Sequence, residues 1–471
     1  MTRYLTDTRR ARVSGRGPRS LFEEQNSPRY MSKEDCQRLF ERVLKLSAGG
    51  GTTTASIDSR WTGNLRWARN KVTTAGDTRD NTIRITREIN GAQATMGTNK
   101  FDDASLKLVI EAAERIIMYN SERPDAPLPP PRQTYLQPKL WSDASYNLDS
   151  HSRSTVGQGL VRPAADQQLV SAGYVQTDAI TRCILNTRGM DAYYPSTRAE
   201  YSVTVRNPTG TGSGWAGVDY NDWAKIDAAA ISAKALRKCV ESADPRAIEP
   251  GRYTVILEPQ AVHDLFVSAI YALDRRSAEM FTTVYTLRPG QSKIGLKILS
   301  EDITVTTDPM DPECGYIPFE ENGMPYKATT WIEKGILKEL AYDRGYALSQ
   351  LGYGAPQPNP RAYRMSGGTT SIDEMIATTE RGLLVTRLSG TNVLDGPSLL
   401  STGTTRDGLW LIERGKIKYP IKNMRFTDSP MFAFSNVLQM GLPTRVFAYY
   451  PSVVPAIKVR DFNFSMLADA V

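Results

Sequence analysis

Residues 52–97 have the sequence TTTASIDSRWTGNLRWARNKVTTAGDTRDNTIRITREINGAQATMG, which is rich in threonine and in alternating apolar positions such as Ile83 and Ile85. This alternation is typical of strands that bury one face. The dipeptide Asn90-Gly91 favours a two-residue hairpin turn. We therefore predict a small antiparallel sheet, with strands at 52–57, 64–70, 81–89 and 92–97.

Two amphipathic helices are predicted on either side of these strands. Ser32 can cap the first, which ends before Gly49 and Gly51. Its apolar residues recur at helical spacing and are Cys36, Leu39, Phe40, Val43 and Leu44. The second helix spans 103–120, and its apolar face comprises Leu106, Val109, Ile110, Ala113 and Ile117. Helix, strands and helix indicate an α+β layer.

The chain then continues the same domain. Six prolines make residues 124–138 an extended crossing rather than a helix. Residues 170–208 are rich in β-branched and aromatic side chains, which predicts further antiparallel strands. A helix is expected over 222–243, with Asp222 as its cap and Pro245 beyond its end.

The residue pattern changes at Gly251, and most of the sequence after this position is typical of β-strands. Two similar hairpins, 329–340 and 409–420, place Gly335 and Gly415 where a tight turn needs a positive φ. We predict a twisted antiparallel sheet or a partly closed barrel. The overall prediction is α+β, with a disordered basic tail (1–30), an N-terminal α+β domain (31–247) and a C-terminal β-rich domain (248–471).

The formal charge of +7 is concentrated in the tail. Residues 1–20 hold six arginines and one aspartate, which amounts to +5 and leaves only +2 for the rest of the chain. A segment with so few large apolar residues buries too little surface to offset the conformational entropy that it would lose on ordering. Any binding of nucleic acid is therefore expected to be weak and to come from this tail, which is more simply explained as a solvated extension.

The sequence predicts no membrane helix, no secretory signal and no disulfide framework. No stretch approaches the ~18 apolar residues that a membrane helix needs, and the N-terminus lacks the apolar core of a secretory signal. Cys36, Cys183, Cys239 and Cys314 are too widely spaced for a zinc ribbon or a disulfide framework. We expect buried, unreactive thiols in a soluble, cytoplasmic protein without a membrane partner.

Several motifs carry a resemblance to one family. In order they are RGLLVT (381–386), TRDG (405–408), IERGKI (412–417) and PIKN (420–423). Earlier segments agree, among them SGWAG (213–217) and FEENGMPYKATTWIEKGILKEL (319–340). Together they resemble the TldD/PmbA family, also described as modulators of DNA gyrase.

The resemblance implies a two-domain α+β protein that works in pairs. One partner, the TldD type, is a zinc peptidase with an HExxxH helix and a later cysteine ligand. The other, the PmbA or TldE type, lacks these ligands and helps to enclose a chamber in which unfolded or small modified peptides are cleaved. The resemblance thus raises the question of which type this chain is.

The ligand positions answer that question. The family's metal helix corresponds here to a degenerate helix at 261–273, where the two histidine positions fall on Val267 and Ala272 and the glutamate position on Ser268. None of these can bind zinc or act as a general base. The chain has only two histidines, His151 and His263, and its C-terminal segment 443–464 has no cysteine. We expect no metal, cofactor or catalytic residue in this chain, and zinc in a TldD-type partner.

Other candidate residues have simpler explanations. His263 and Asp264 are neighbours on a helix and point about 100° apart, so we expect a surface or capping histidine rather than a relay. The Gly-rich segments lack the lysine and helix of a phosphate loop. The large aromatics are expected in the core or at an interface, namely Tyr193, Tyr194, Tyr449, Tyr450, Trp331 and Trp410.

Three functions remain open. The first is a non-catalytic partner subunit of a TldD-type heterodimeric metallopeptidase, with a homodimer possible when the chain is alone. The second is a stand-alone hydrolase that uses carboxylates such as Glu320, Glu321 or Asp343. The third is a DNA- or gyrase-associated binding protein. The missing ligands favour the first.

Overall fold

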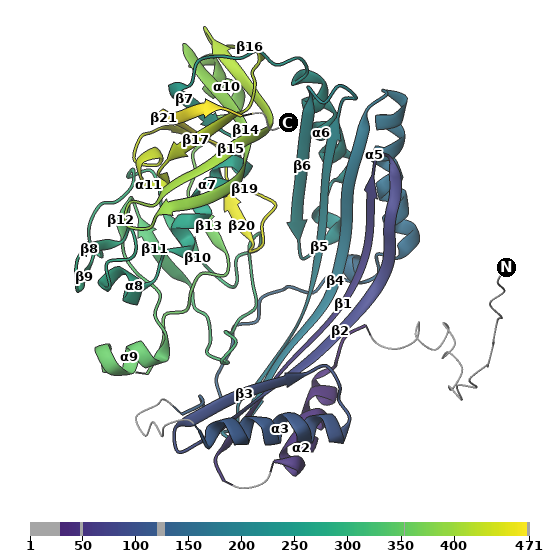
Figure 1. The fold of residues 1–471 in the computed structure, drawn as a ribbon, viewed down its shortest axis with the longest axis vertical. Helices are drawn as coiled ribbons and strands as arrows, with labels where there is room; N and C mark the ends of the chain where they lie inside the picture. The colour runs from purple at the N-terminus through teal and green to yellow at the C-terminus, as the bar shows by residue number, and fades with distance from the viewer. Residues whose placement is uncertain (1–28, 48–49, 120–127, 353, 469–471) are drawn as a thin grey trace, which may run out of the picture.

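The computed structural model describes residues 29–47, 50–119, 128–352 and 354–468. Figure 1 shows a long, curved sheet formed by the N-terminal half of the chain, with the β-rich C-terminal part beside its upper end. The predicted basic tail and the start of the proline-rich crossing lie outside the described residues, except for Arg29 and Tyr30. The Arg29 guanidinium lies 4.0 Å from the ring centroid of Trp61, so the last residues of the predicted tail, 29 and 30, include one that packs against sheet A.

The N-terminal sheet, here called sheet A, has six antiparallel strands. In spatial order they are β3 (Ala92–Thr98), β2 (Lys71–Ile89), β1 (Thr52–Ala68), β4 (Val170–Asn186), β5 (Asp191–Arg206) and β6 (Ser213–Tyr220). The predicted strands 52–57 and 64–70 are one strand, because Trp61 and Gly63 continue the alternating burial between them. The predicted turn is confirmed: Asn90 and Gly91 both have positive φ, 51° and 77°.

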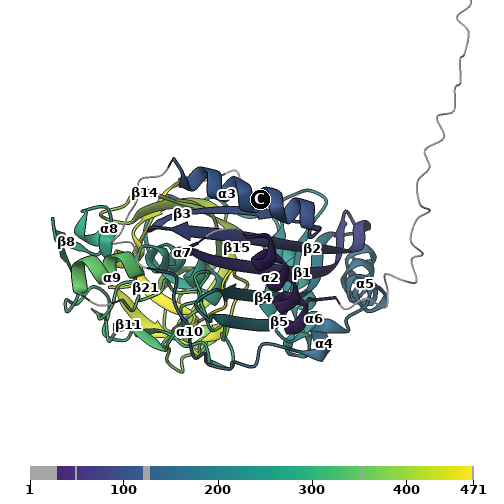
Figure 2. The same cartoon turned by 90° about the horizontal axis from the view of Figure 1, so that it is seen from below.

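Helices cover one face of sheet A, α2 and α3 at one end and α5 and α6 at the other (Figures 1 and 2). Their bounds are α2 (Lys33–Leu46), α3 (Asp103–Ile117), α4 (Asp143–Tyr146), α5 (Ser150–Asp166), η1 (Trp223–Lys225) and α6 (Ala228–Glu241). The predictions for α2 and α3 are confirmed, except that α3 ends at Ile117 instead of at residue 120. Ser32 forms a capping box with Asp35, and the predicted apolar faces are buried apart from the half-exposed Leu44.

Two helical details differ from expectation. Asp222 caps only the short η1 turn, and α6 begins six residues later with Asp227 as its cap. Helix α5 was not predicted, since Gly157, Gly159 and Pro163 lower its helix propensity. Packing stabilises it instead: a Cβ added at Gly157 would lie 2.7 Å from Leu65, so this glycine allows the helix to approach the sheet closely.

The C-terminal part contains a partly closed barrel, as predicted. Its strands are β14 (Arg381–Asp395), β7 (Gly251–Leu257), β21 (Ile457–Leu467), β17 (Met424–Asp428) and β15 (Leu400–Glu413), with β16 (Lys416–Pro420) beyond β15 and β18 (Val437–Met440) on β21. Pairing of β14 with β15 links the two ends of this path. Strands β7 and β14 are parallel to each other, and the other neighbouring strands of the barrel are antiparallel.

A second C-terminal sheet packs near the barrel. It comprises β12 (Ile336–Leu337), β11 (Thr329–Glu333), β10 (Val305–Thr307), β13 (Tyr363–Met365), β20 (Ser452–Val454) and β19 (Thr444–Arg445), and β8 (Thr286–Arg288) pairs separately with β9 (Gln291–Ser292). The remaining helices are α7 (Pro259–Tyr271), α8 (Arg275–Glu279), α9 (Arg344–Leu351), α10 (Ile372–Ala377) and α11 (Pro430–Ala433). Gly335 and Gly415 have φ of 74° and 73°, so both predicted hairpin turns are confirmed. The two hairpins lie in different sheets.

All four cysteines are buried and free, as expected. Burial raises the pKa of Cys239 to about 11 and that of Cys314 to about 12, which keeps both thiols protonated and unreactive at neutral pH. Over the part of the chain that the structure describes, no helix is long and apolar enough to cross a membrane.

Candidate functional site

Helix α7 is the element that the sequence marks as a degenerate metal helix. It spans 259–271 rather than the predicted 261–273, because Pro259 begins it directly after the extended Glu258. The predicted apolar stripe is confirmed, since Val262, Leu265, Phe266, Ala269, Ile270 and Leu273 are all buried. These residues join a core cluster that includes strands of both C-terminal sheets, so α7 is a central core helix.

The positions assigned to metal ligands do not fit a divalent ion. Val267 and Ala272 offer only hydrocarbon, and the Ser268 hydroxyl donates to the Leu265 carbonyl of its own helix at 3.0 Å. Zinc needs imidazole, thiolate or carboxylate ligands. Within the described ranges, no group of three or more His, Cys, Asp or Glu residues is arranged to hold a metal ion.

His263 is buried, so the prediction of a surface or capping histidine is wrong. Its Nδ1 lies 2.9 Å from the Tyr363 hydroxyl, which comes from β13, and the two rings are stacked. Burial, helped by the charge of Arg445, lowers the pKa of His263 to about 4, so the ring is neutral. The sequence could not reveal this environment, because the residues that cover α7 lie far away along the chain.

Asp264 points away from His263 and makes its own contacts, in keeping with the expectation that the two do not pair. Its carboxylate accepts hydrogen bonds from the Leu388 amide and from Gln260 Nε2, each at 2.9 Å. Burial raises its pKa to about 6, against the opposing charge of Arg387. In these two neighbouring residues of α7, burial therefore disfavours the cationic form of His263 and the anionic form of Asp264.

A buried ion pair joins the start of α7 to sheet A's helix α6. The Glu258 carboxylate contacts Lys238 Nζ and, at 3.1 Å, Lys234 Nζ, and Lys238 also donates to Thr386 at 3.0 Å. Although burial opposes it, the two lysines hold the pKa of Glu258 below its ordinary value. Burial lowers the pKa of Lys238 to about 8, so the pair is ionic at neutral pH. Partners 20 residues apart on separate elements gave no sequence signal.

Tyrosines fill the space beside Val267. Val267, Tyr271, Tyr363 and Tyr450 line a recess of about 10 Å³, room for roughly one water molecule. This α7 recess is therefore closed to a peptide. Arg361 strengthens the closure, because its guanidinium lies 5.2 Å from the Tyr450 ring centroid and donates to the Tyr450 hydroxyl.

A larger cleft of about 710 Å³, here called the central cleft, separates sheet A from the C-terminal part. Side chains of β4 and β5 form one wall, including Arg182 and Arg198, and residues 310–317 with Tyr449 form the other. The buried charges across it are paired: Arg445 Nη2 lies 2.8 Å from Asp219, whose other oxygen accepts the Ala448 amide. This pairing joins the two parts of the molecule at the cleft.

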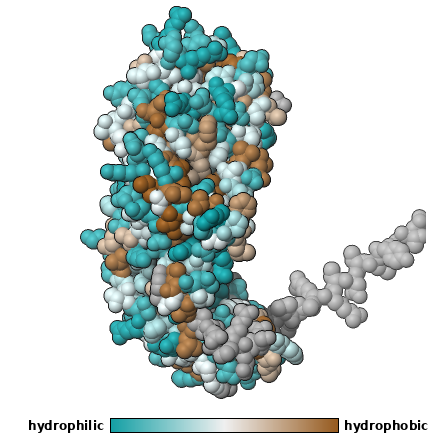
Figure 3. Space-filling view, turned by 90° about the vertical axis from the view of Figure 1, so that its left-hand side faces the viewer, coloured by the Kyte–Doolittle hydropathy of each residue, from teal (hydrophilic) through white to brown (hydrophobic). Residues whose placement is uncertain are grey.

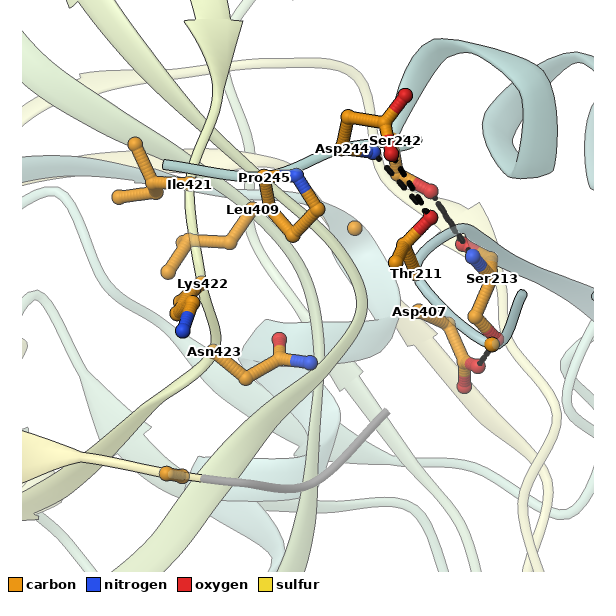
Figure 4. Close-up of a pocket in the computed structure, with 13 residues that line it drawn as sticks. Thr211, Ser213, Ser242, Asp244, Pro245, Asp407, Leu409, Ile421, Lys422 and Asn423 are labelled. Atoms are coloured by element: carbon orange, nitrogen blue, oxygen red, sulfur yellow. Dashed lines mark hydrogen bonds between the residues drawn. The ribbon is translucent and has the colours of Figure 1, made fainter. Parts of the chain in front are cut away.

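A second cavity, of about 450 Å³, lies between the β5–β6 loop and the barrel (Figure 4). Asp407 of β15 enters it from a bulge, with φ of 58°, and accepts a hydrogen bond from the Ser213 hydroxyl at 2.6 Å. Ser242 binds the Ser213 amide and carbonyl. These groups satisfy one another, so the cavity is a joint between the two parts rather than a set of reactive groups.

The candidate carboxylates do not form an acid and base pair. Glu320 accepts from Asn322 within a turn, and burial raises its pKa. Asp343 caps α9 through the Tyr346 amide, and Glu321 is exposed. Of the aromatics singled out, Tyr194, Trp331 and Trp410 are buried as expected, Tyr193 and Tyr450 are half-buried, and Tyr449 is 75 % exposed.

Comparison with known proteins relates this chain to one family. The chain matches the model of the PmbA/TldA metallopeptidase central domain over residues 154–243 and that of the C-terminal domain over 250–466, together more than half of its length. Curated relatives include the metalloprotease TldD homolog of Buchnera aphidicola subsp. Acyrthosiphon pisum, 24 % identical over 52 % of this chain and 55 % of the relative. Metalloprotease PmbA of Escherichia coli O157:H7 is 23 % identical over 45 % of this chain and 46 % of the relative.

Solved structures agree over more of the chain. A Thermotoga maritima protein described as a DNA gyrase modulator has a TM-score of 0.81 and 15 % identity, covering 91 % of this chain and 100 % of its own. TldE from Thermococcus kodakarensis has a TM-score of 0.78 and 17 % identity, covering 91 % and 99 %. These likenesses show the fold, whereas the match to curated relatives spans about half of their length. The chain belongs to the PmbA/TldD family.

Proposed function

We propose that this chain is a non-catalytic subunit that pairs with a TldD-type zinc metallopeptidase and forms one wall of a chamber for unfolded or small modified peptides. The observation that carries the proposal is the chemistry of α7. The helix keeps its buried stripe, while Val267, Ser268 and Ala272 stand where the family resemblance assigns ligands and base. The zinc of such a complex would be held by the partner.

The surface of the chain supports a role in binding. The central cleft has the volume of a ligand pocket, and β6, the edge strand of sheet A, ends at it with Asp219 and Tyr220. A sheet edge can hold an extended peptide through main-chain hydrogen bonds. Apolar patches mark the face that carries β8 and β9 (Figure 3), where Met280, Phe281 and Leu287 are about half-exposed or more. Exposed apolar patches favour protein contacts.

The proposal predicts the metal content and the activity of the purified protein, alone and in its complex. Alone, it should hold no stoichiometric zinc and should not cleave peptides. Co-expressed with a relative that carries HExxxH, it should form a complex with one copy of each chain, and the complex should hold zinc and cleave unfolded peptides. Metal analysis, peptidase assays and native mass spectrometry measure these properties. Tightly bound zinc in the lone chain would overturn the proposal.

The same samples separate the other functions. Peptidase activity of the lone chain that falls on changing Glu320 or Asp343 would indicate a stand-alone hydrolase. Salt-sensitive DNA binding that survives deletion of residues 1–30 would indicate a DNA-associated role beyond the basic tail. A stable homodimer that never exchanges with a TldD-type chain would argue against the heterodimer. We further propose a cytoplasmic setting, in which the buried cysteines stay reduced.

A further inference from the structure

Three tyrosines extend from the end of α7 to the central cleft, and we call them the tyrosine triplet: Tyr271, which is the last residue of α7, Tyr449 and Tyr450. The ring centroids of Tyr449 and Tyr450 are 4.7 Å apart with an interplanar angle of 67°, and those of Tyr271 and Tyr450 are 6.4 Å apart at 76°. Both pairs meet edge to face, the arrangement that aromatic rings favour. Two of the rings remain open, because Tyr271 is 57 % exposed and Tyr449 is 75 % exposed.

The middle ring of the triplet is fixed. Arg361 lies over Tyr450 and donates to its hydroxyl, and Arg361 Nε also donates to the Tyr326 hydroxyl at 3.1 Å. Pro451 follows Tyr450 and restricts the backbone. The two exposed rings therefore stand on a rigid support, so that a ligand would lose little conformational freedom of the protein on binding.

The triplet links the α7 recess with the central cleft. Tyr271 and Tyr450 line the α7 recess with Val267, and Tyr449 lines the central cleft with Pro451. A ligand in the cleft thus meets the exposed Tyr449 ring, and the triplet extends from this ring to Tyr271, at the end of the helix on which the family resemblance places the metal.

The charges around the cleft limit the kind of ligand. Arg198 contacts Glu200 at 3.0 Å, Arg445 contacts Asp219, and Asp311 accepts two hydrogen bonds from Arg364. Because these charges are already paired within the protein, a ligand group that bound one of them would have to compete with its partner. The exposed rings of Tyr271 and Tyr449 offer neutral aromatic faces that a ligand can contact without breaking such a pair.

We propose that the tyrosine triplet is a subsite for a neutral aromatic side chain of an extended peptide held in the central cleft. This proposal rests on the proposed function, which places peptides in the cleft, and it adds the kind of side chain that this chain selects. Tyrosine suits such a subsite because it offers a large, rigid contact area and is frequent among the residues that dominate binding energy.

The test compares two uncharged, fluorescently labelled peptides that differ only in a central phenylalanine or leucine. Anisotropy titrations use the full chain alone and its one-to-one complex with a TldD-type relative. Since aromatic contacts add affinity beyond their area, we expect the phenylalanine peptide to bind about two- to tenfold more tightly. The Y449A and Y271A variants should lose this preference, and Y449F should keep it. Y119A is the matched control, because Tyr119 is 89 % exposed at the end of α3, outside the cleft.

Each other outcome overturns the subsite. Equal affinity for the two peptides, no binding in either sample, or a preference that survives in Y449A would contradict it. If Y449A left the preference intact but abolished complex formation, the triplet would be a subunit contact instead. Failure of the subsite and failure of the proposed function are distinguishable, because zinc content and complex formation of the unmodified chain are measured separately.

Discussion

The two faces of sheet A are built from the same strands and differ in almost every property. Along β1, Ala55, Ile57 and Trp61 lie under the helices and are buried, whereas the intervening Asp58 and Arg60 lie on the open face. The open face carries ion pairs across strands, such as Arg60 with Asp178 of β4. A period of two residues therefore separates the apolar core, on the covered face, from the polar side chains and ion pairs on the face that turns to the central cleft.

The covered face should be the more sensitive by a wide margin. Trp67 is 1 % exposed and packs against Gly157 and Gly173, so W67A should lower the free energy of unfolding by about 3–5 kcal/mol. Its neighbour Arg66 is exposed on the open face, and R66A should change the free energy of unfolding by less than about 0.5 kcal/mol. Urea unfolding of both variants measures the difference. Similar losses in the two would mean that the open face is a second core.

The second prediction extends the comparison to the contact between the two parts of the molecule. Lys238 and Lys234 bind the same Glu258 carboxylate, but their side chains are 5 % and 46 % exposed. K238M should cost about 3 kcal/mol, because it leaves the buried carboxylate to Lys234 alone. K234M should cost at most about 1 kcal/mol, as is usual for an exposed pair. Urea midpoints of the two variants provide the measurement, and equal midpoints would contradict the role of burial.

The third prediction concerns the pH dependence of stability and compares two neighbouring residues of α7, Asp264 and His263. The pKa of Asp264 in the folded chain, about 6, lies above its ordinary value of 3.8, so its contribution to stability is full below that value and is lost as pH rises through 6. At 1.4 kcal/mol for each unit of pKa, the loss is at most about 3 kcal/mol. D264N removes this dependence. Its stability relative to the unmodified chain should therefore be higher at pH 8 than at pH 5 in urea unfolding.

His263 supplies the control of opposite sign. Its pKa in the folded chain, about 4, lies below the ordinary 6.5, so its contribution is full above 6.5 and is lost as pH falls through 4. H263Q should therefore gain stability relative to the unmodified chain as pH falls from 7 to 5. If the stabilities of D264N and H263Q relative to the unmodified chain changed in the same direction between pH 5 and pH 8, the pKa shift of at least one of the two residues would be contradicted.

What the sequence could predict follows from the range of the interactions. Helices α2 and α3, the Asn90-Gly91 turn and the stripe of α7 depend on local spacing, and each was predicted close to its observed residues. Helix α5 was missed because distant packing, not propensity, stabilises it.

The candidate site shows the same limit. Missing ligands at Val267 and Ala272 could be inferred from the family motif, but the burial of His263 depends on Tyr363, 100 residues away. The sequence predicts Tyr449 and Tyr450 in the core or at an interface, whereas the contact of Tyr271 with Tyr450 is visible only in the fold. Contacts between distant elements are therefore what the sequence left undetermined.

The smallest expected effect lies on the open face itself. Asp58 is partly exposed and binds Arg84 Nη2 and Arg182 Nε, each at 2.9 Å. D58N should lower the free energy of unfolding by no more than about 1 kcal/mol, and salt should reduce this loss because exposed charges are screened. Asp178 is the control, since it is 0 % exposed and D178N removes the charge that faces Arg60. Its loss should be larger and should persist in 1 M salt, where the Debye length is ~3 Å. Urea unfolding at low and high salt measures both, and a large, salt-independent loss in D58N would contradict the prediction that the exposure of Asp58 weakens its ion pairs relative to that of Asp178.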